Sequence, residues 1–273
     1  MNLPRTLIIL AVVVPVVGLL LLWLRRTPSS DRTWAADQAL MPKVTFDGSR
    51  FTVENLRNLR WTDSTNFVPS WETRSYDLDR VSSAWYVLVP FSSRWRGPAH
   101  SFVSFGFDDG RYLAISVEAR RQLGESYGVL RGLFRQFELI YVLGDESDLI
   151  GRRAVYDGTD VFLYPIAATP EARRAVLRGM LERAESLRAH PEFYHTITNN
   201  CTLNLVRHVN QFAPGRIPQS WRLALPGYSD QVALAVGLID STLPLDQARA
   251  RYRINDRARA AMDSPDFSAR IRL

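Results

Sequence analysis

A continuous apolar segment near the N-terminus constrains this chain more than any other feature. Residues 6–24 read TLIILAVVVPVVGLLLLWL and contain no charged side chain. About 20 apolar residues span a bilayer as a helix, and such helices tolerate proline and glycine. A cleaved signal peptide has a shorter apolar region that ends in small residues, whereas this segment is followed by Arg25 and Arg26. We therefore predict one retained transmembrane helix within residues 1–26.

The charges around this segment bear on which side of the membrane the rest of the chain occupies. Three arginines follow the segment within eight residues, and one precedes it. Taken alone, the positive-inside rule places the residues that follow in the cytoplasm. Residues 27–41 are polar and read as a linker. Residues 42–273 are enough to bury a core of their own, and we predict one domain there.

The basic composition does not indicate a nucleic-acid-binding protein. The 273 residues carry a formal net charge of +6, and the pI is about 9.8. Arginine supplies nearly all of the positive charge, because Lys43 is the only lysine. The arginines are scattered among acidic and apolar residues and form no basic arm or recognition motif. We therefore expect no nucleic-acid partner.

The cysteine and histidine content restricts the chemistry further. Cys201 is the only cysteine, so the chain has no intramolecular disulfide and no cysteine-rich metal site. The four histidines show no metal-ligand spacing. We expect neither a metal nor another cofactor. A lone cysteine is either a small buried apolar residue or a reactive thiol, and its neighbours decide between the two.

The hydrophobic pattern changes along the chain from strand-like to helical. Short β-type runs with turn residues between them fill the stretch from about residue 43 to residue 165. The expected strands are Lys43–Val53, Ser83–Pro90, His100–Phe107, Tyr112–Glu118, Phe137–Leu143 and Asp160–Tyr164. The expected helices are Thr169–Arg188, Cys201–Phe212, Ser229–Ile239 and Leu245–Met262. Strands followed by helices predict an α+β fold.

The segment around Cys201 carries the clearest chemical signal. Asn199 and Asn200 are good N-cap residues, and apolar positions at helical spacing begin just after them. We therefore expect Cys201 in the first turn of a helix, where unpaired N–H groups and the helix dipole stabilise a thiolate. The same N–H groups can hold an oxyanion during acyl transfer. A small cysteine packed at a helix start fits this segment equally well.

A reactive thiol needs a base, and His100 has the most suitable surroundings. The two expected strands on either side of Asp108-Asp109-Gly110 have the signature of a hairpin with a three-residue loop. If Phe107 pairs with Arg111, His100 lies directly opposite Glu118 on a polar face. The carboxylate can then orient the imidazole. A shift of one residue in the register would place the two side chains on opposite faces.

Two alternatives remain open at this point. A His–Glu pair across two strands is common on protein surfaces and contributes only about 0.2–1 kcal/mol. His195 is close to Cys201 in sequence and is a second candidate for the base. His208 is too far away, because seven residues of helix separate it from Cys201 by about 10 Å.

Several segments, in order along the chain, resemble one bacterial family. They are DRTW (31–34), HSFVSFGFDDG (100–110), ISVEAR (115–120), FRQFELIYVLGDESDLI (134–150), PEFYHTITNNCT (191–202) and LPGYSD (225–230). They resemble proteins that carry the Lnb N-terminal periplasmic domain, and the similarity runs from about residue 31 to the C-terminus. The resemblance implies a domain outside the cytoplasm. On this ground we expect the periplasm, against the charge asymmetry around the apolar segment.

The resemblance also implies a fold and a chemistry. Lnb transfers a lipid acyl chain to the N-terminal cysteine of a lipoprotein, but it has several membrane spans where this chain has one predicted span. The family is similar to circularly permuted papain-like proteins, in which a strand histidine and a polar partner on the next strand precede a cysteine at a helix start. This pattern implies that His100 is the base, Glu118 its orienting partner and Cys201 the nucleophile. Many relatives have Tyr-Asn where this chain has Tyr194-His195.

We therefore expect a single-pass inner-membrane protein with a periplasmic thiol acyltransferase or hydrolase domain. The expected substrate is a lipid or lipoprotein acyl group, held on Cys201 as a thioacyl intermediate. Asn199 and Asn200 are expected to assist the oxyanion, and Tyr194 and His195 to contact the substrate. The alternatives are a papain-like amidase or peptidase for cell-wall peptides and a non-catalytic periplasmic binding or scaffold module, because a shared fold does not fix a substrate.

Overall fold

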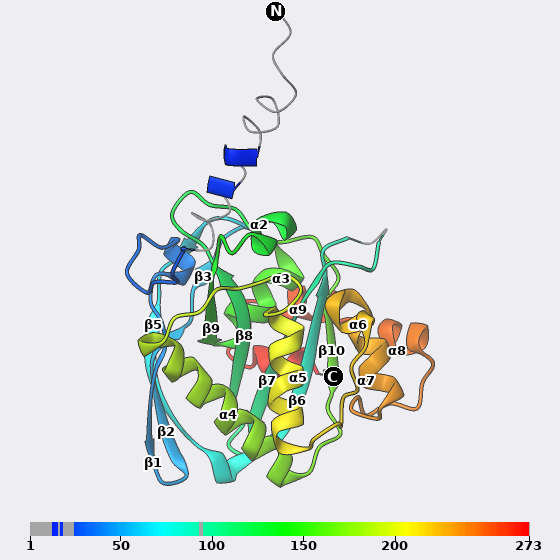
Figure 1. The fold of residues 1–273 in the computed structure, drawn as a ribbon. Helices are drawn as coiled ribbons and strands as arrows, with labels where there is room; N and C mark the ends of the chain where they lie inside the picture. Colours follow the sequence, from blue (N-terminus) through cyan, green and yellow to red (C-terminus); the bar gives the residue numbers. More distant parts are fainter. Residues whose placement is uncertain (1–12, 16, 19–24, 93–94, 273) are drawn as a thin grey trace, which may run out of the picture.

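The computed structural model describes residues 13–15, 17–18, 25–92 and 95–272 (Figure 1). The predicted transmembrane helix therefore lies mostly outside the described residues. The described parts of it, 13–15 and 17–18, are helical. Within the ranges given above, no helix is both long and apolar enough to cross a bilayer.

A mixed β-sheet forms the centre of the domain. Its strands are β1 (Lys43–Asp47), β2 (Arg50–Arg57), β5 (Trp71–Asp77), β6 (Val81–Pro90), β7 (Ala99–Phe107), β8 (Tyr112–Arg120), β9 (Glu138–Gly144) and β10 (Phe162–Pro165). Neighbouring strands follow the order β1-β2-β9-β8-β7-β6-β10, and β5 pairs with β2. Of the described strand pairs, only β2 with β9 is parallel. A separate small hairpin consists of β3 (Arg60–Trp61) and β4 (Phe67–Val68).

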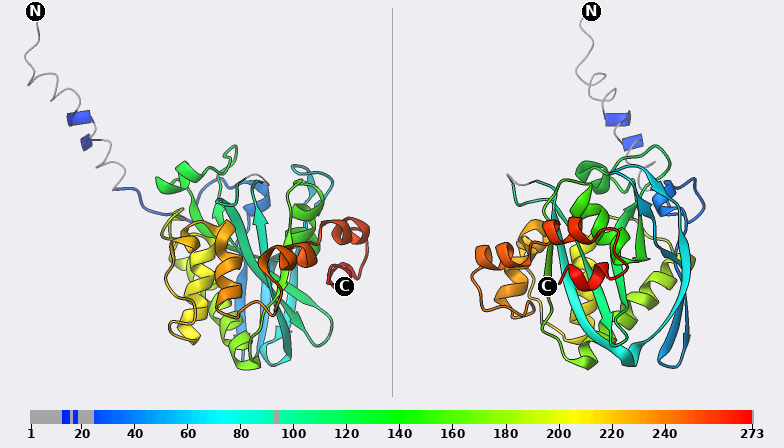
Figure 2. Two further views of the ribbon diagram at one scale, coloured as in Figure 1. Left: turned by 90° about the vertical axis from the view of Figure 1, so that its right-hand side faces the viewer. Right: turned by 180° about the vertical axis from the view of Figure 1, so that it is seen from behind.

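Helices cover both faces of the sheet (Figures 1 and 2). On one face lie α4 (Pro170–Ala189) and α5 (Cys201–Phe212), and on the other lie α3 (Arg152–Val155), α9 (Asn255–Ala261) and α10 (Phe267–Arg270). The other helices are α2 (Val129–Leu133), α6 (Trp221–Ala224), α7 (Ser229–Ala235) and α8 (Leu245–Tyr252), with single turns η1 (Ala36–Gln38), η2 (Leu78–Arg80), η3 (Ser147–Gly151) and η4 (Pro226–Tyr228). Burial from both sides explains why every residue of β9 is buried and why Leu139–Leu143 form a continuous run without charge.

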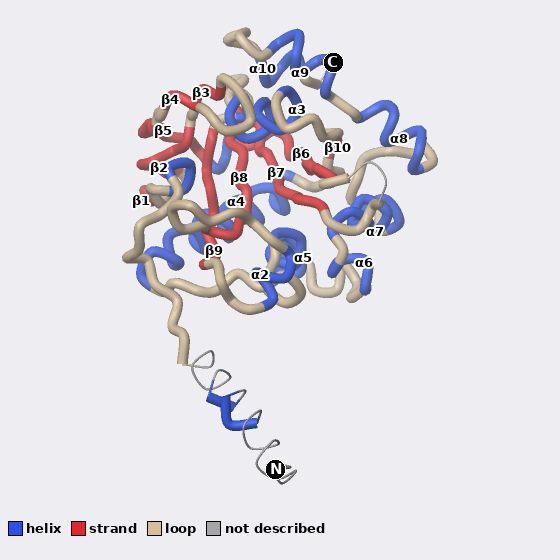
Figure 3. Tube along the Cα trace, turned by 90° about the horizontal axis from the view of Figure 1, so that it is seen from above, coloured by secondary structure: helices blue, strands red, loops and turns tan. Residues whose placement is uncertain are grey.

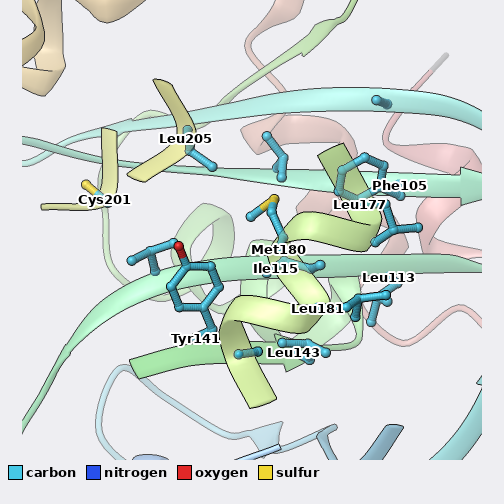
Figure 4. Close-up of a cluster of buried hydrophobic side chains, with 14 of the residues drawn as sticks. Phe105, Leu113, Ile115, Tyr141, Leu143, Leu177, Met180, Leu181, Cys201 and Leu205 are labelled. Carbon is cyan, nitrogen blue, oxygen red and sulfur yellow. The ribbon is translucent and has the colours of Figure 1, made fainter. Parts of the chain in front are cut away.

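The larger core lies between the sheet and the α4–α5 pair (Figure 4). Leu177 and Leu181 of α4 belong to the same buried cluster as Ile115 of β8. Cys201 and Leu205 of α5 belong to this cluster too, so Cys201 lies on the α4–α5 face of the sheet.

The β7–β8 hairpin has the predicted register. The Phe107 N–H donates to the Arg111 carbonyl at 2.9 Å, and Gly110 takes the left-handed conformation at φ +82°, which only glycine adopts without cost. Pairing continues as far as Val103 with Ile115 and ends there. Beyond that pair, β7 stays on β6 and β8 stays on β9. The two strands therefore separate toward the end of the sheet where α5 begins.

The α+β class is confirmed, although some predicted elements have different bounds. Residues 43–53 form a hairpin instead of one strand, because the chain turns at Gly48 with φ +64°. The predicted helix Leu245–Met262 is two helices, because the Ile254 N–H donates to the Val161 carbonyl at 2.9 Å and interrupts the helical bonding. The strand β5 was not expected. The papain-like permutation stays a prediction.

Candidate active site

Cys201 is the first residue of α5, as predicted. Asn200 is the N-cap, and its Oδ1 accepts a hydrogen bond from the Leu203 N–H at 2.8 Å. Thr202 Oγ1 lies 2.8 Å from Ser101 Oγ, and this contact attaches the helix start to β7. The Cys201 side chain is buried. Both the helix cap and the strand contact therefore fix the position of the thiol.

His100, Ser116 and Glu118 form a hydrogen-bonded chain across the gap between β7 and β8. His100 Nε2 is 2.7 Å from Ser116 Oγ, and Ser116 Oγ donates to Glu118 Oε1 at 2.8 Å. His100 Nε2 and Glu118 Oε1 are themselves 4.0 Å apart. The sequence places His100 and Glu118 on one face correctly, but their hydrogen-bonded connection runs through a serine.

This chain of bonds determines which ring nitrogen of His100 carries the proton. A serine hydroxyl has one proton to donate, and Ser116 gives it to the carboxylate. Ser116 Oγ must then accept from His100 Nε2–H, which leaves the lone pair on Nδ1. Nδ1 makes no hydrogen bond to any residue that the structure describes. A neutral imidazole in this tautomer can take a proton at Nδ1.

Charged and polar neighbours hold Glu118 in its ionised form. Arg153 Nη2 donates to Oε1 at 2.8 Å, and Gln38 Nε2 donates to Oε2 at 2.9 Å. Burial by itself raises the pKa of Glu118, but the charges of Arg153 and Arg57 lower that pKa by more. Burial, followed by the charge of Arg153, lowers the pKa of His100 to about 3. At neutral pH the histidine is therefore an uncharged base beside a charged carboxylate.

Cys201 and His100 line one cavity of about 270 Å³. Cys201 reaches it from the α4–α5 face of the sheet. His100 stacks on Phe102 with 5.4 Å between ring centroids, and Phe102 belongs to the core of the opposite face. The two side chains thus meet where β7 and β8 separate. In the part of the chain that the structure describes, no hydrogen bond joins them, and Cys201 Sγ lies 3.9 Å from Thr202 Oγ1.

Two tyrosines also line the cavity. The hydroxyls of Tyr127 and Tyr194 are 3.4 Å apart, and the rings meet edge to face with 6.1 Å between their centroids. Burial, and then the charge of a Cys201 thiolate, raises the pKa of Tyr194 well above its ordinary value. Burial also raises the pKa of Tyr127. Both hydroxyls therefore keep their protons and can donate hydrogen bonds inside the cavity.

The other predicted site residues have their side chains bonded within the loop that precedes α5. Asn199 Nδ2 donates to the Phe193 carbonyl at 2.9 Å, and Asn200 is occupied by capping the helix. His195 Nδ1 accepts from the Thr198 N–H at 3.2 Å. None of the three is among the described residues that line the cavity. Tyr194 is the member of this predicted group that the structure brings to Cys201.

His208 is not among the described residues that line the cavity. His208 Nε2 is 2.9 Å from the Tyr141 hydroxyl behind α5, and burial lowers the pKa of His208 to about 4. Across the described ranges, no group of three His, Cys, Asp or Glu side chains is placed to hold a metal ion.

Several residues around Glu118 and Cys201 were not identified from the sequence. Ser116 lies two residues before Glu118 on β8 and therefore on the same face, so the period-two pattern of a strand was sufficient to find it. Arg153 and Gln38 approach Glu118 from distant parts of the chain, and no local pattern marks them. Tyr127 lies in the irregular connection between β8 and β9, where spacing carries no information.

The fold and the cavity define an α+β domain with a cysteine at a helix start and an oriented strand histidine. The chain matches the model of the Lnb N-terminal periplasmic domain over residues 67–227, which is more than half of its length, and it belongs to that family. The matched range contains Cys201, His100 and Glu118. Among curated proteins and among solved structures, none matches the chain. Membership of this family assigns the domain to the periplasm.

Proposed function

We propose that this protein is a thiol-dependent acyltransferase or hydrolase that a transmembrane helix anchors in the inner membrane. One observation carries the proposal: Cys201, His100 and Glu118 line the same cavity, and Ser116 connects the histidine to the carboxylate by hydrogen bonds. A cysteine with a purely structural role does not require a nearby neutral histidine of defined tautomer. It also does not require a buried carboxylate that orients that histidine. A nucleophile and base with a third group orienting the base is the arrangement that covalent catalysis uses.

The proposed reaction has two steps. In the first, His100 Nδ1 takes the thiol proton while Cys201 Sγ attacks the carbonyl carbon of an ester. The oxyanion collapses, the C–O bond breaks, and the leaving alcohol receives the proton from His100. In the second, water or an amine loses a proton to His100 and attacks the thioester. The acyl group then leaves Cys201, and the thiol regains its proton.

Donors for the oxyanion are present at the helix start and in the cavity. Within the described residues, the N–H groups of Cys201 and Thr202 donate no hydrogen bond, as is usual for the first turn of a helix. The hydroxyls of Tyr127 and Tyr194 are protonated and lie in the same cavity. Preorganised donors of this kind contribute strongly to acyl transfer. These four groups take the role that the sequence assigned to Asn199 and Asn200.

The absence of a direct bond between Cys201 and His100 is compatible with this mechanism. Catalytic hydrogen bonds are often long in structures without substrate and tighten only in the complex. Burial disfavours the charged form of His100, so the structure without substrate does not favour a preformed thiolate–imidazolium pair.

A lipid or lipoprotein acyl group is the substrate class we propose. Aromatic side chains of Phe91, Tyr127 and Tyr194 line part of the cavity and can pack against an acyl chain. Charged side chains line another part of the cavity: Asp37, Glu118, Arg121, Arg152, Arg153 and Asp157. The activity known for Lnb supports the same class by analogy only.

A trapped intermediate tests the proposal. We expect full-length protein in phospholipid vesicles containing a triacylated lipoprotein or its diacyl precursor to acquire an acyl mass on Cys201, released by neutral hydroxylamine. Cys201→Ala should acquire none. An unmodified thiol together with cleavage of muropeptides would replace the lipid substrate with a cell-wall peptide. An unmodified thiol and intact muropeptides would favour a binding module.

A further inference from the structure

One end of the sheet gathers loops that are far apart in sequence. β6 and β8 finish there, and β7 and β9 begin there, so residues 91–92 and 95–98 of one connection and residues 121–137 of the other lie at this end. The turn before α5 joins them, because the Tyr194 N–H donates to the Phe137 carbonyl at 2.9 Å. We call this the Cys201 end of the domain; it is the upper end in Figure 1, and Figure 3 looks down on it.

Large apolar side chains are exposed on all three of these connections. They are Phe91, Trp95, Leu123, Leu130, Phe134 and Ile197, and their exposed fractions range from 47% to 70%. We call this set the apolar rim. Monomeric soluble proteins rarely leave so many large apolar groups uncovered at one end, and such patches mark contacts with proteins or membranes.

Contacts between the connections show that the apolar rim is one surface. Thr196 Oγ1 donates to the Val129 carbonyl at 2.8 Å, which joins the turn before α5 to α2. The rings of Phe91 and Tyr127 lie edge to face, 6.1 Å apart between centroids. This contact connects the segment after β6 to the segment between β8 and β9. Phe91 of the rim and its neighbour Tyr127 also line the cavity that contains Cys201, so the rim reaches the cavity.

The N-terminal segment enters the domain at this same end. The Leu123 N–H donates to the Thr33 carbonyl at 2.9 Å, and Arg32 pairs with Glu138 at the start of β9 at 2.8 Å. The residues just before Arg25 are the uncharged apolar run 6–24. The anchor proposed for that run would hold the Cys201 end close to the membrane.

The charge at the Cys201 end also suits a lipid surface. Arg25, Arg26 and Arg131 are exposed there. Among the nearby acidic groups, Asp31 is exposed, whereas Glu125 is partly buried and accepts from Gln136 at 2.8 Å. Arginines next to a bilayer are attracted to anionic headgroups, and tryptophan and other aromatic side chains favour the interface.

We propose that the domain rests on the bilayer through the apolar rim, so that the cavity of Cys201 opens toward the lipid headgroups. The inference rests on the proposed anchor and gives the proposed enzyme direct access to membrane-bound acyl groups. It does not require that the enzyme be active, because the contact is made by loops and not by the catalytic side chains.

Fluorescence quenching by lipid tests this orientation. Full-length Cys201→Ser protein is given one new cysteine, Leu130→Cys on α2 or Leu123→Cys on the loop between β8 and α2, and labelled with an environment-sensitive fluorophore. Phe212→Cys is the matched control, because Phe212 is an exposed apolar residue at the other end of α5. The proteins are reconstituted in phosphatidylethanolamine–phosphatidylglycerol vesicles that carry a quencher on the acyl chains.

We expect the label at positions 130 and 123 to shift to the blue and to lose most of its fluorescence, while the label at 212 does neither. Equal, weak quenching at all three positions would overturn the proposal, as would a chain that does not float with the vesicles. Wild-type protein assayed for an acyl adduct on Cys201 separates the two ideas. An adduct without quenching refutes only the docked orientation, and quenching without an adduct refutes only the enzyme.

Discussion

Ser116→Ala should weaken the preference of His100 for the Nε2–H tautomer while the residues that line the cavity stay the same. The substitution leaves His100 Nε2–H without the acceptor that now lies 2.7 Å away. A buried polar group that loses its partner costs about 1–3 kcal/mol. Since about 1.4 kcal/mol corresponds to a factor of ten, the ratio of the Nε2–H to the Nδ1–H tautomer should fall by about 5- to 150-fold. The ¹⁵N chemical shifts of the imidazole, measured at pH 7, report this ratio directly.

Ser104→Ala is the matched control for this experiment. Ser104 is a fully buried serine on the neighbouring strand β7, and its hydroxyl makes no hydrogen bond to the part of the chain that the structure describes. The same atom is removed, but no bond to a histidine is lost. The His100 shifts should therefore match wild type. A His100 that keeps its tautomer in Ser116→Ala, or that changes equally in both variants, would refute the hydrogen-bonded chain.

Two further predictions concern stability. Asp148 accepts hydrogen bonds from Arg57 at 2.9 and 3.0 Å and is fully buried, so Asp148→Ala should lower the free energy of unfolding by about 3–5 kcal/mol in urea titrations. Asp266→Ala, which removes an exposed ion pair, should change it little, and equal effects would contradict this view of Asp148. His208 has a pKa of about 4 when folded against about 6.5 when unfolded, so stability should fall as the pH drops through that window. His208→Gln should show a shallower fall between pH 7 and pH 5, and parallel curves would show that His208 is not the cause.

The elements predicted correctly are those with strong local signals. The hairpin of β7 and β8 combines a glycine that its turn requires with alternating side chains, and its register followed from these. The start of α5 followed from the Asn200 cap. Strand β5 was missed because Tyr76 is its only buried residue, so no alternation marks it.

The site was partly predictable for the same reason. Cys201, His100 and Glu118 lie within or at the ends of regular elements, where spacing fixes direction. Polar residues just before a helix are ambiguous, because the unpaired backbone groups there also need partners. Asn199 and Asn200 meet that need and do not face the cavity. The Arg153 contact depends on tertiary packing that no local pattern encodes.

Alkylation of Cys201 in two histidine variants tests the central claim most directly. Because Cys201 is the only cysteine, iodoacetamide incorporation into the full-length protein has a single origin. At pH 7, His100→Gln should alkylate at least about tenfold more slowly than wild type, since loss of general-base assistance is worth about 10²–10⁴-fold in catalysis. His195→Gln should match wild type, because His195 Nδ1 is occupied by the loop. Equal rates for wild type and His100→Gln, or a loss of rate only in His195→Gln, would contradict the pairing of Cys201 with His100.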